Sequence, residues 1–250
     1  MINAGAGDPR AALSVIARGQ VGSDPWERAV VHLLWGYPQL AAGDLAQAEH
    51  EFASAADAFR SLGDRWGTSL ALDALAGLAG LYGDPSKAIA LIDEALALTE
   101  QLGAVEDLPD LLCNRGDHRV RTALAGRDGP DGPDAAGTGL AEARADYERA
   151  AEIARHAGSP TYLAGALRGL GDIARLEGDP AGARLLYEQA MERFETHWVK
   201  SAGNRTATLF GLGKVAEAAG DLDEARSLHR QAVEVATAAG SIVESARRPR

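Results

Sequence analysis

A short pattern of small residues recurs along this chain of 250 residues, at a spacing of about 40 residues. In each copy an alanine is followed seven positions later by a second alanine, with a larger residue between them. Residues seven apart lie on one face of an α-helix, so each pair lets a second helix approach closely. The pairs are Ala48 and Ala55, Ala88 and Ala95, Ala143 and Ala150, Ala183 and Ala190, and Ala225 and Ala232, with Phe52, Ile92, Tyr147, Tyr187 and His229 between them.

A second helix precedes each alanine pair and ends in a turn. Glycine ends a helix readily, and aspartate caps the start of the next one, so a Gly-Asp step predicts a helix hairpin. Such steps occur five residues before the first alanine at Gly43-Asp44, Gly83-Asp84, Gly178-Asp179 and Gly220-Asp221. Twelve residues before that alanine the preceding helix carries a small residue, namely Gly36, Ala76, Gly171 or Gly213, with Gly116 as the counterpart in the third copy.

Self-similarity at this period indicates a solenoid in which each hairpin packs on the next. The order of an apolar-small pair, a small residue, an aromatic residue and another small residue resembles the tetratricopeptide repeat over residues 7 to 240. The resemblance implies an all-α fold, a right-handed α-α superhelix of about five helix hairpins plus an extra N-terminal helix. The alternative is a helical bundle without repeats.

The predicted organisation is a single solenoid domain over residues 1–250. A stretch rich in glycine, proline and aspartate, 126–139, is expected to be a flexible loop inside the third repeat, because this composition disfavours a helix. Incomplete hairpins at both ends favour a piece of a longer protein, with a complete small protein as the alternative. The predicted repeats span 25–63, 64–103, 107–158, 159–203 and 204–240, with partial repeats at 7–19 and 241–250.

Composition narrows the classes of function. The net charge of −11 disfavours direct nucleic-acid binding, which requires clustered positive charge. No apolar run reaches the length of about 18 residues that a membrane span needs, and the first 20 residues do not resemble a signal peptide. The single cysteine, Cys113, excludes an internal disulfide. We therefore expect a cytoplasmic protein that does not contact membranes.

The sequence offers no recognisable catalytic or cofactor motif. No two of the six histidines lie three or four residues apart, so no helix face presents a ready metal site. Gly169 and Gly171, like Gly211 and Gly213, fall inside predicted helices, where close helix packing explains them better than a phosphate loop. No nucleophile elbow occurs. We expect no cofactor, no metal and no catalysis; an enzyme that uses a solenoid cleft is the less favoured alternative.

The resemblance to tetratricopeptide repeats implies that the first helix of each hairpin lines a groove. The side chains three before, one after and four after the small residue then face that groove. Arg168, Arg175 and Lys214 would hold a carboxylate or phosphate there, or would instead pair with Asp172 and Glu217. The candidate groove residues are Leu33, Tyr37, Asp73, Asp117, Arg121, Arg168, Asp172, Arg175, Phe210 and Lys214.

Two stretches, 63–79 and 220–240, resemble the C-terminal tetratricopeptide repeats of SARP-type and large LuxR-type actinobacterial regulators. This resemblance implies a sensing or scaffolding domain of a transcription regulator of antibiotic biosynthesis. The implied partner is a protein, a peptide or another domain of the same parent chain, with a small molecule in the groove as a further possibility. A stand-alone cytosolic adaptor is the alternative.

Overall fold

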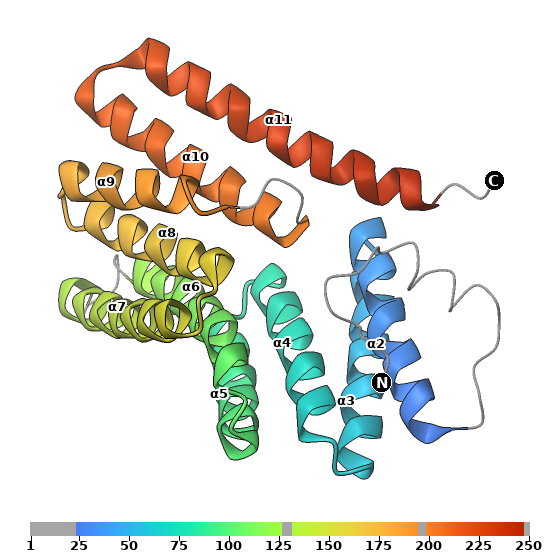
Figure 1. The fold of residues 1–250 in the computed structure, drawn as a ribbon. Coiled ribbons are helices and arrows are strands. Elements are labelled where there is room, and N and C mark those ends of the chain that lie inside the picture. The colour runs from blue at the N-terminus through green and yellow to red at the C-terminus, as the bar shows by residue number, and fades with distance from the viewer. Residues whose placement is uncertain (1–23, 127–131, 195–198, 248–250) are drawn as a thin grey trace. The chain divides into compact units, whose positions relative to one another are not determined.

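The computed structural model describes residues 24–126, 132–194 and 199–247, and all regular structure within these ranges is helical (Figure 1). The chain divides into two compact units. Unit 1 comprises residues 1–104 and 243–250, and unit 2 comprises residues 105–242. The helices are α2 (Pro25–Ala42), α3 (Leu45–Ser61), α4 (Arg65–Leu81), α5 (Pro85–Leu102), the 3-10 helix η1 (Val105–Asp107), α6 (Leu108–Gly126), α7 (Gly132–His156), α8 (Pro160–Leu176), α9 (Pro180–Met191), α10 (Val199–Ala219) and α11 (Leu222–Arg247).

The hairpin turns follow the predicted chemistry. Gly43, Gly83, Gly178 and Gly220 all have positive φ angles, between 79° and 86°, a conformation that favours glycine. The aspartate that follows each glycine caps the next helix. Asp179 Oδ1, for example, accepts a hydrogen bond of 2.9 Å from the backbone N–H of Gly182. These local signals confirm the predicted all-α hairpins.

Unit 1 is built from two hairpins, α2 with α3 and α4 with α5, and α3 packs on α4. The ring of Phe52 is fully buried between them. A Cβ atom at Gly36 would overlap this ring, so only glycine allows α2 to approach α3 as it does. Tyr37 packs edge-on against Phe52 with ring centroids 5.1 Å apart. The alanines of both pairs in this unit, Ala48, Ala55, Ala88 and Ala95, are fully buried.

Unit 2 repeats this packing with two buried tyrosines. A Cβ at Gly116 on α6 would lie 2.7 Å from the ring of Tyr147, and one at Gly169 on α8 would overlap the same ring. The ring of Tyr187 likewise excludes a Cβ at Gly171, its own hairpin partner, and at Gly211 on the following first helix. Each tyrosine therefore separates two successive first helices, which confirms that these glycines serve close packing.

The last hairpin carries a histidine at the tyrosine position. A Cβ at Gly213 would overlap the ring of His229, so the close approach is preserved. The ring lies against Phe210, with centroids 4.8 Å apart. His229 Nε2 lies 3.1 Å from Glu217 Oε1. Arg175, at the same position of the preceding hairpin, donates from its Nε to the Tyr187 hydroxyl at 3.4 Å.

The predicted loop at 126–139 is wrong for its second half. Helix α7 begins at Gly132, so 132–139 are helical, whereas 127–131 lie outside the described residues. Tertiary contacts outweigh the composition: Ala136 is buried, and a Cβ at Gly139 would lie 3.0 Å from that of Ala123. Pro133 falls in the first turn, where its missing N–H costs no helical hydrogen bond.

The expected ends of the repeats also need correction. Helix α11 runs through Gly240 to Arg247, so no new hairpin begins at 241 within the described residues. One glycine costs a helix only about 1 kcal/mol, which does not force it to end. Helix α10 begins at Val199, before the predicted 204. The predicted partial repeat at 7–19 lies outside the described residues, and the single solenoid domain stays a prediction.

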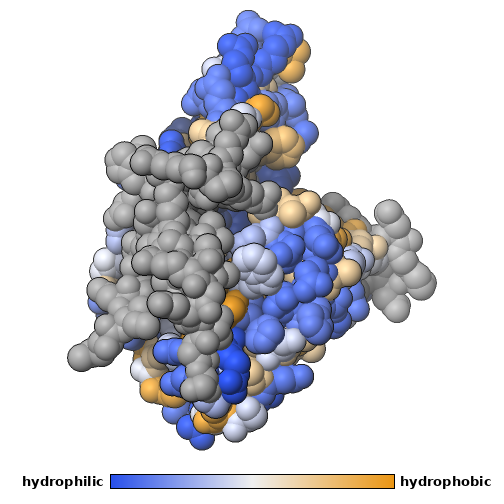
Figure 2. All heavy atoms as spheres, turned by 90° about the vertical axis from the view of Figure 1, so that its right-hand side faces the viewer, coloured by the Kyte–Doolittle hydropathy of each residue, from blue (hydrophilic) through white to orange (hydrophobic). Residues whose placement is uncertain are grey.

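Unit 1 carries most of its charge as carboxylates. Residues 24–104 contain twelve acidic side chains and four basic ones. On the face drawn in Figure 2, hydrophilic side chains predominate among the described residues, and the apolar ones between them are scattered.

The glycine–tyrosine contact can be tested by adding one methyl group. Gly169→Ala places a Cβ where the Tyr147 ring lies, so the free energy of unfolding should fall by about 1–3 kcal/mol. Gly137→Ala on α7, where the new Cβ meets open space, should instead raise it by about 0.5–1 kcal/mol. Urea unfolding of both variants measures the difference. Equal effects of the two substitutions would contradict the packing described above.

Candidate ligand-binding face of unit 2

The first helices of the hairpins in unit 2 are α6, α8 and α10, called inner helices below, and the second helices α7, α9 and α11 are called outer helices. Helix α8 is in contact with both α6 and α10 (Figure 1). Their side chains are joined by a partly buried charge network. Arg168 on α8 is 7% exposed, and its Nη2 donates to Oδ1 and Oδ2 of Asp117 on α6, at 2.8 and 2.9 Å. Its Nη1 donates to Asp172 Oδ2 at 3.0 Å. The network thus links successive inner helices.

The two buried tyrosines extend this network to the outer helices. The Tyr147 hydroxyl donates to Asp117 Oδ1 at 2.6 Å, and the Tyr187 hydroxyl donates to Asp172 Oδ1 at 2.7 Å. Burial raises the pKa of both phenols above the ordinary value, and the charge of the adjacent carboxylate raises it further. Both phenols therefore stay neutral donors at physiological pH, and each carboxylate is held between an arginine and a tyrosine.

The cations predicted to hold an anion are already paired within the chain. Arg168 is paired as above, Arg175 Nη2 lies 3.6 Å from Asp172 Oδ1, and Lys214 Nζ lies 3.1 Å from Glu217 Oε2. The alternative of mutual ion pairing therefore holds. Arg121 differs, because its Nη1 lies 3.3 Å from Nδ1 of His118. Burial lowers the pKa of His118, and the Arg121 guanidinium lowers it further.

A pocket of about 30 Å³ opens between the three inner helices, beside Arg168. The Nε atom of Arg168 is buried and has no hydrogen-bond partner among the described residues. The thiol of Cys113 also lines the pocket, and burial raises its pKa so that it stays protonated. The lining residues are Asp110, Cys113, Asn114 and Asp117 of α6, Thr161, Tyr162, Gly165 and Arg168 of α8, and Asn204 of α10.

Of the predicted groove residues, Asp117 and Arg168 line this pocket. Cys113, three residues before Gly116, also satisfies the rule for groove-facing positions. The sequence reasoning missed the other lining residues, which lie one to two helical turns nearer the N-terminus of α6, α8 and α10 than the predicted residues. Continuing the 3.6-residue period backwards from Asp117 and Arg168 reaches Asn114 and Gly165, so a signal existed for these two. Nothing comparable pointed to Asn204.

Further along α10, the predicted residue Phe210 is 51% exposed. The Nζ atom of Lys214 lies 5.3 Å from the centre of its ring, within the range of a cation–π contact. The imidazole ring of His229 also packs against the ring of Phe210. An exposed aromatic side chain held in place by two neighbours is a suitable contact for an apolar group of a partner.

The predicted groove residues of unit 1 behave differently. Leu33 is 7% exposed and belongs to the core with Phe52 and Phe59, so the expectation that it lines a groove is wrong. The face of α2 that carries Leu33 packs in the core of unit 1 rather than facing solvent. Tyr37 is 47% exposed, and Asp73 is half-buried and engaged with other groups.

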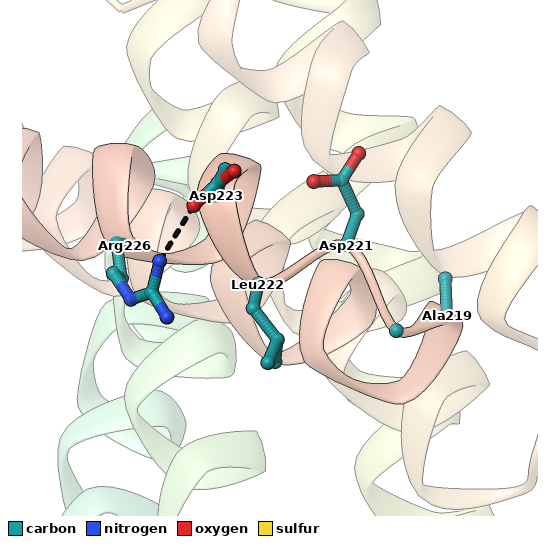
Figure 3. A pocket seen from close by; sticks show the side chains of 6 residues that line it. Ala219, Asp221, Leu222, Asp223 and Arg226 are labelled. Atoms are coloured by element: carbon teal, nitrogen blue, oxygen red, sulfur yellow. Dashed lines mark hydrogen bonds and ion pairs between the residues drawn. The ribbon is translucent and has the colours of Figure 1, made fainter.

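A larger recess of about 580 Å³ lies at the turn between α10 and α11 (Figure 3). Its polar groups already have partners, because Asp221 caps α11 by accepting from the N–H of Glu224 at 3.0 Å. Asp223 likewise accepts from Arg226 at 2.5 Å. This recess is the outer surface of a hairpin turn and does not gather groups suited to a ligand.

The described residues were also compared with the requirements of a metal site and of a membrane-spanning helix. Within 24–126, 132–194 and 199–247, no group of three or more histidine, cysteine and carboxylate side chains is placed to bind a metal ion. No helix in the same ranges is long and apolar enough to cross a membrane.

Comparisons with known proteins agree with this architecture. Residues 138–196, which extend from α7 to just beyond α9, match the tetratricopeptide repeat family. No curated protein matches the chain. Similar solved structures include BtubC (BKLC) from P. vanneervenii, with 19% identity over 97% of this chain and 93% of that one and a TM-score of 0.59.

Two further structures have the same fold. TTC0263, a thermophilic tetratricopeptide-repeat protein of Thermus thermophilus, is 19% identical over 87% of this chain and 98% of its own, with a TM-score of 0.58. NprR in complex with its cognate peptide NprX is 15% identical over 92% of this chain, with a TM-score of 0.61, and the match spans 63% of NprR. The chain therefore has the fold of a tetratricopeptide-repeat solenoid.

The raised pKa of the two buried tyrosines gives a test at alkaline pH. The folded chain keeps phenolic protons that the unfolded chain loses above about pH 10. The stabilisation is present below pH 10 and is lost as the pH rises through the folded-state pKa. An ultraviolet titration should show Tyr147 and Tyr187 ionising only together with unfolding, and Tyr147→Phe should remove one phenol from that step. Ionisation of all five tyrosines while the helices persist would contradict the burial.

The buried network predicts unequal costs for two ion pairs. Asp117→Ala leaves the Arg168 guanidinium buried with Asp172 as its remaining carboxylate, so the free energy of unfolding should fall by about 3–5 kcal/mol. Lys214→Ala breaks an exposed pair and should cost less than about 1 kcal/mol. Urea unfolding at neutral pH measures both, and similar small costs would show that the Asp117 contact is dispensable.

Proposed function

We propose that this tetratricopeptide-repeat fold serves as a non-catalytic interaction domain that binds an extended peptide or a flexible segment of a protein. The surface proposed to bind it is formed by α6, α8 and α10 in unit 2. The observation that carries the proposal is the pocket between these three helices, which is lined by Asn114 of α6, Arg168 of α8 and Asn204 of α10. Polar groups that converge from three helices suit the amide groups of a peptide.

Two further observations support a peptide or protein partner. Phe210 on α10 offers an exposed ring six residues beyond Asn204, which is about 9 Å along the helix axis. The structure of NprR, which has the same fold, contains a bound cognate peptide. The ion pairs of Arg168, Arg175 and Lys214 disfavour a phosphate-bearing small molecule, because the chain's own carboxylates already occupy these cations.

We further place this domain, as a hypothesis, in the regulatory part of a larger bacterial transcription regulator of the antibiotic-biosynthesis type. The support is the resemblance of 63–79 and 220–240 to the repeats of SARP-type and large LuxR-type regulators. The test is to introduce Phe210→Ala into the chromosomal gene and to measure transcripts of antibiotic-biosynthesis genes. Unchanged transcripts, together with lost partner binding, would contradict this context and favour an adaptor.

Peptide binding can be tested with a displayed library of random dodecapeptides selected against the full chain. Phe210→Ala should weaken the selected peptides about tenfold, equivalent to about 1.4 kcal/mol, because the exposed ring is lost. Leu185→Ala is the matched control, since Leu185 is 56% exposed on the outer helix α9. Isothermal titration calorimetry measures both affinities. Failure to recover any binding peptide, or equal losses in both variants, would overturn the proposed surface.

A further inference from the structure

A further recess of unit 2 lies between η1 and the C-terminal end of α7, with a volume of about 370 Å³. This volume is at the lower end of the range of about 300–1,000 Å³ for small-molecule sites, so the recess is large enough for one long side chain. Its lining is separate from that of the pocket between α6, α8 and α10. The lining residues are Val105 and Glu106 of η1, Glu152, Ile153 and His156 of α7, and Ala157.

Three of the lining residues are apolar and accessible. Val105 is 51% exposed, Ile153 is half-buried, and Ala157 is exposed. A ligand can therefore contact them without any opening of the fold. Long cationic side chains lay their methylene stems on apolar surface while the charged head stays near water, so this wall suits such a stem.

The other three lining residues are exposed and offer hydrogen-bond acceptors. The carboxylates of Glu106 and Glu152 make no hydrogen bond or ion pair with the part of the chain that the structure describes. The Nδ1–H of His156 donates to the backbone oxygen of Glu152 at 2.9 Å, so the lone pair of the neutral imidazole lies on Nε2. The recess thus presents three acceptors, from both η1 and α7.

The charges around the recess favour a cation. Asp107 of η1 and Arg149, one turn before Ile153 on α7, are both engaged with other groups. Arg155 is two residues from Ile153 and therefore points to nearly the opposite side of α7. The charges left at the recess are those of its two glutamates, and the partial negative charge at the C-terminal end of α7 acts in the same direction.

We propose that this recess binds the side chain of an arginine from a partner protein. The methylene stem lies on Val105 and Ile153, and the guanidinium donates to Glu106, Glu152 and Nε2 of His156. Arginine fits better than lysine, because its planar guanidinium carries five N–H donors in fixed directions and is less strongly hydrated than an ammonium group. The site is independent of the peptide-binding surface proposed on α6, α8 and α10, and it adds a contact that selects positive charge.

The first test titrates capped single amino acids into the full chain with labelled methyl groups. N-acetylarginine methylamide should shift the methyl resonances of Val105 and Ile153 in a saturable way. The citrulline analogue has the same shape without the charge and should bind about fivefold more weakly, as expected for the loss of exposed ion pairs. The lysine analogue should also bind more weakly than the arginine analogue. Equal affinities of the arginine analogue and either of the other two, or no saturable shift with arginine, would overturn the proposal.

The second test removes one charge at a time and repeats the arginine titration. Glu152→Gln and Glu106→Gln should each weaken binding about two- to fivefold, the range expected for an exposed ion pair. Glu148→Gln is the matched control, because this exposed glutamate is one turn earlier on α7 and does not line the recess. It should leave the affinity nearly unchanged.

The pattern of losses decides between a site and a general attraction to an acidic chain. Equal losses in Glu152→Gln and Glu148→Gln would overturn the site. All three substitutions are at exposed positions, so unchanged melting temperatures should accompany them. Binding of library peptides to the surface of α6, α8 and α10 is measured separately, so a failure of the arginine site leaves the proposed function standing.

Discussion

The packing of unit 2 depends on the contact between a tyrosine ring and two glycines on successive inner helices. Tyr147 fills the space between Gly116 and Gly169, and no side chain larger than hydrogen fits at either glycine. Protein interiors are packed as densely as organic crystals, so this contact fixes the spacing and rotation of α6 and α8 together. The tyrosine hydroxyl then falls within hydrogen-bonding distance of Asp117, the residue next to the first glycine.

The same contact explains why ionised groups are tolerated inside the unit. A buried guanidinium is costly unless it is paired in good geometry, and Arg168 finds two carboxylates whose positions the tyrosines fix. Because Tyr147 and Tyr187 each hold one of these carboxylates, the charge pairs cannot be rearranged independently of the helix packing. The Arg168 nitrogen that finds no partner among the described residues is Nε.

Much of the fold could be predicted from the sequence because its signals are local. A glycine followed by a capping aspartate identifies the hairpin turns at Gly43, Gly83, Gly178 and Gly220, and the seven-residue alanine spacing identifies the packed face. The start of α7 could not be predicted, since Gly132 and Pro133 disfavour a helix locally and the contact of Gly139 with Ala123 decides the outcome. The pocket was missed for a related reason: Asn114 and Asn204 come from different helices, and no local pattern brings them together.

The groove prediction failed at Leu33 because one rule was applied to every hairpin. The position three before the small residue is buried in the core at Leu33, buried in the ion network at Arg168, and 51% exposed at Phe210. The neighbouring residue decides among these outcomes. In the last hairpin Lys214 replaces the aspartate and His229 replaces the tyrosine, so the half-buried carboxylate that pairs with an arginine in the earlier hairpins is missing. Lys214 pairs instead with Glu217 near solvent, a weak interaction, and the ring of Phe210 stays accessible. An exposed aromatic surface therefore arises where the repeated contact of tyrosine, aspartate and arginine is interrupted.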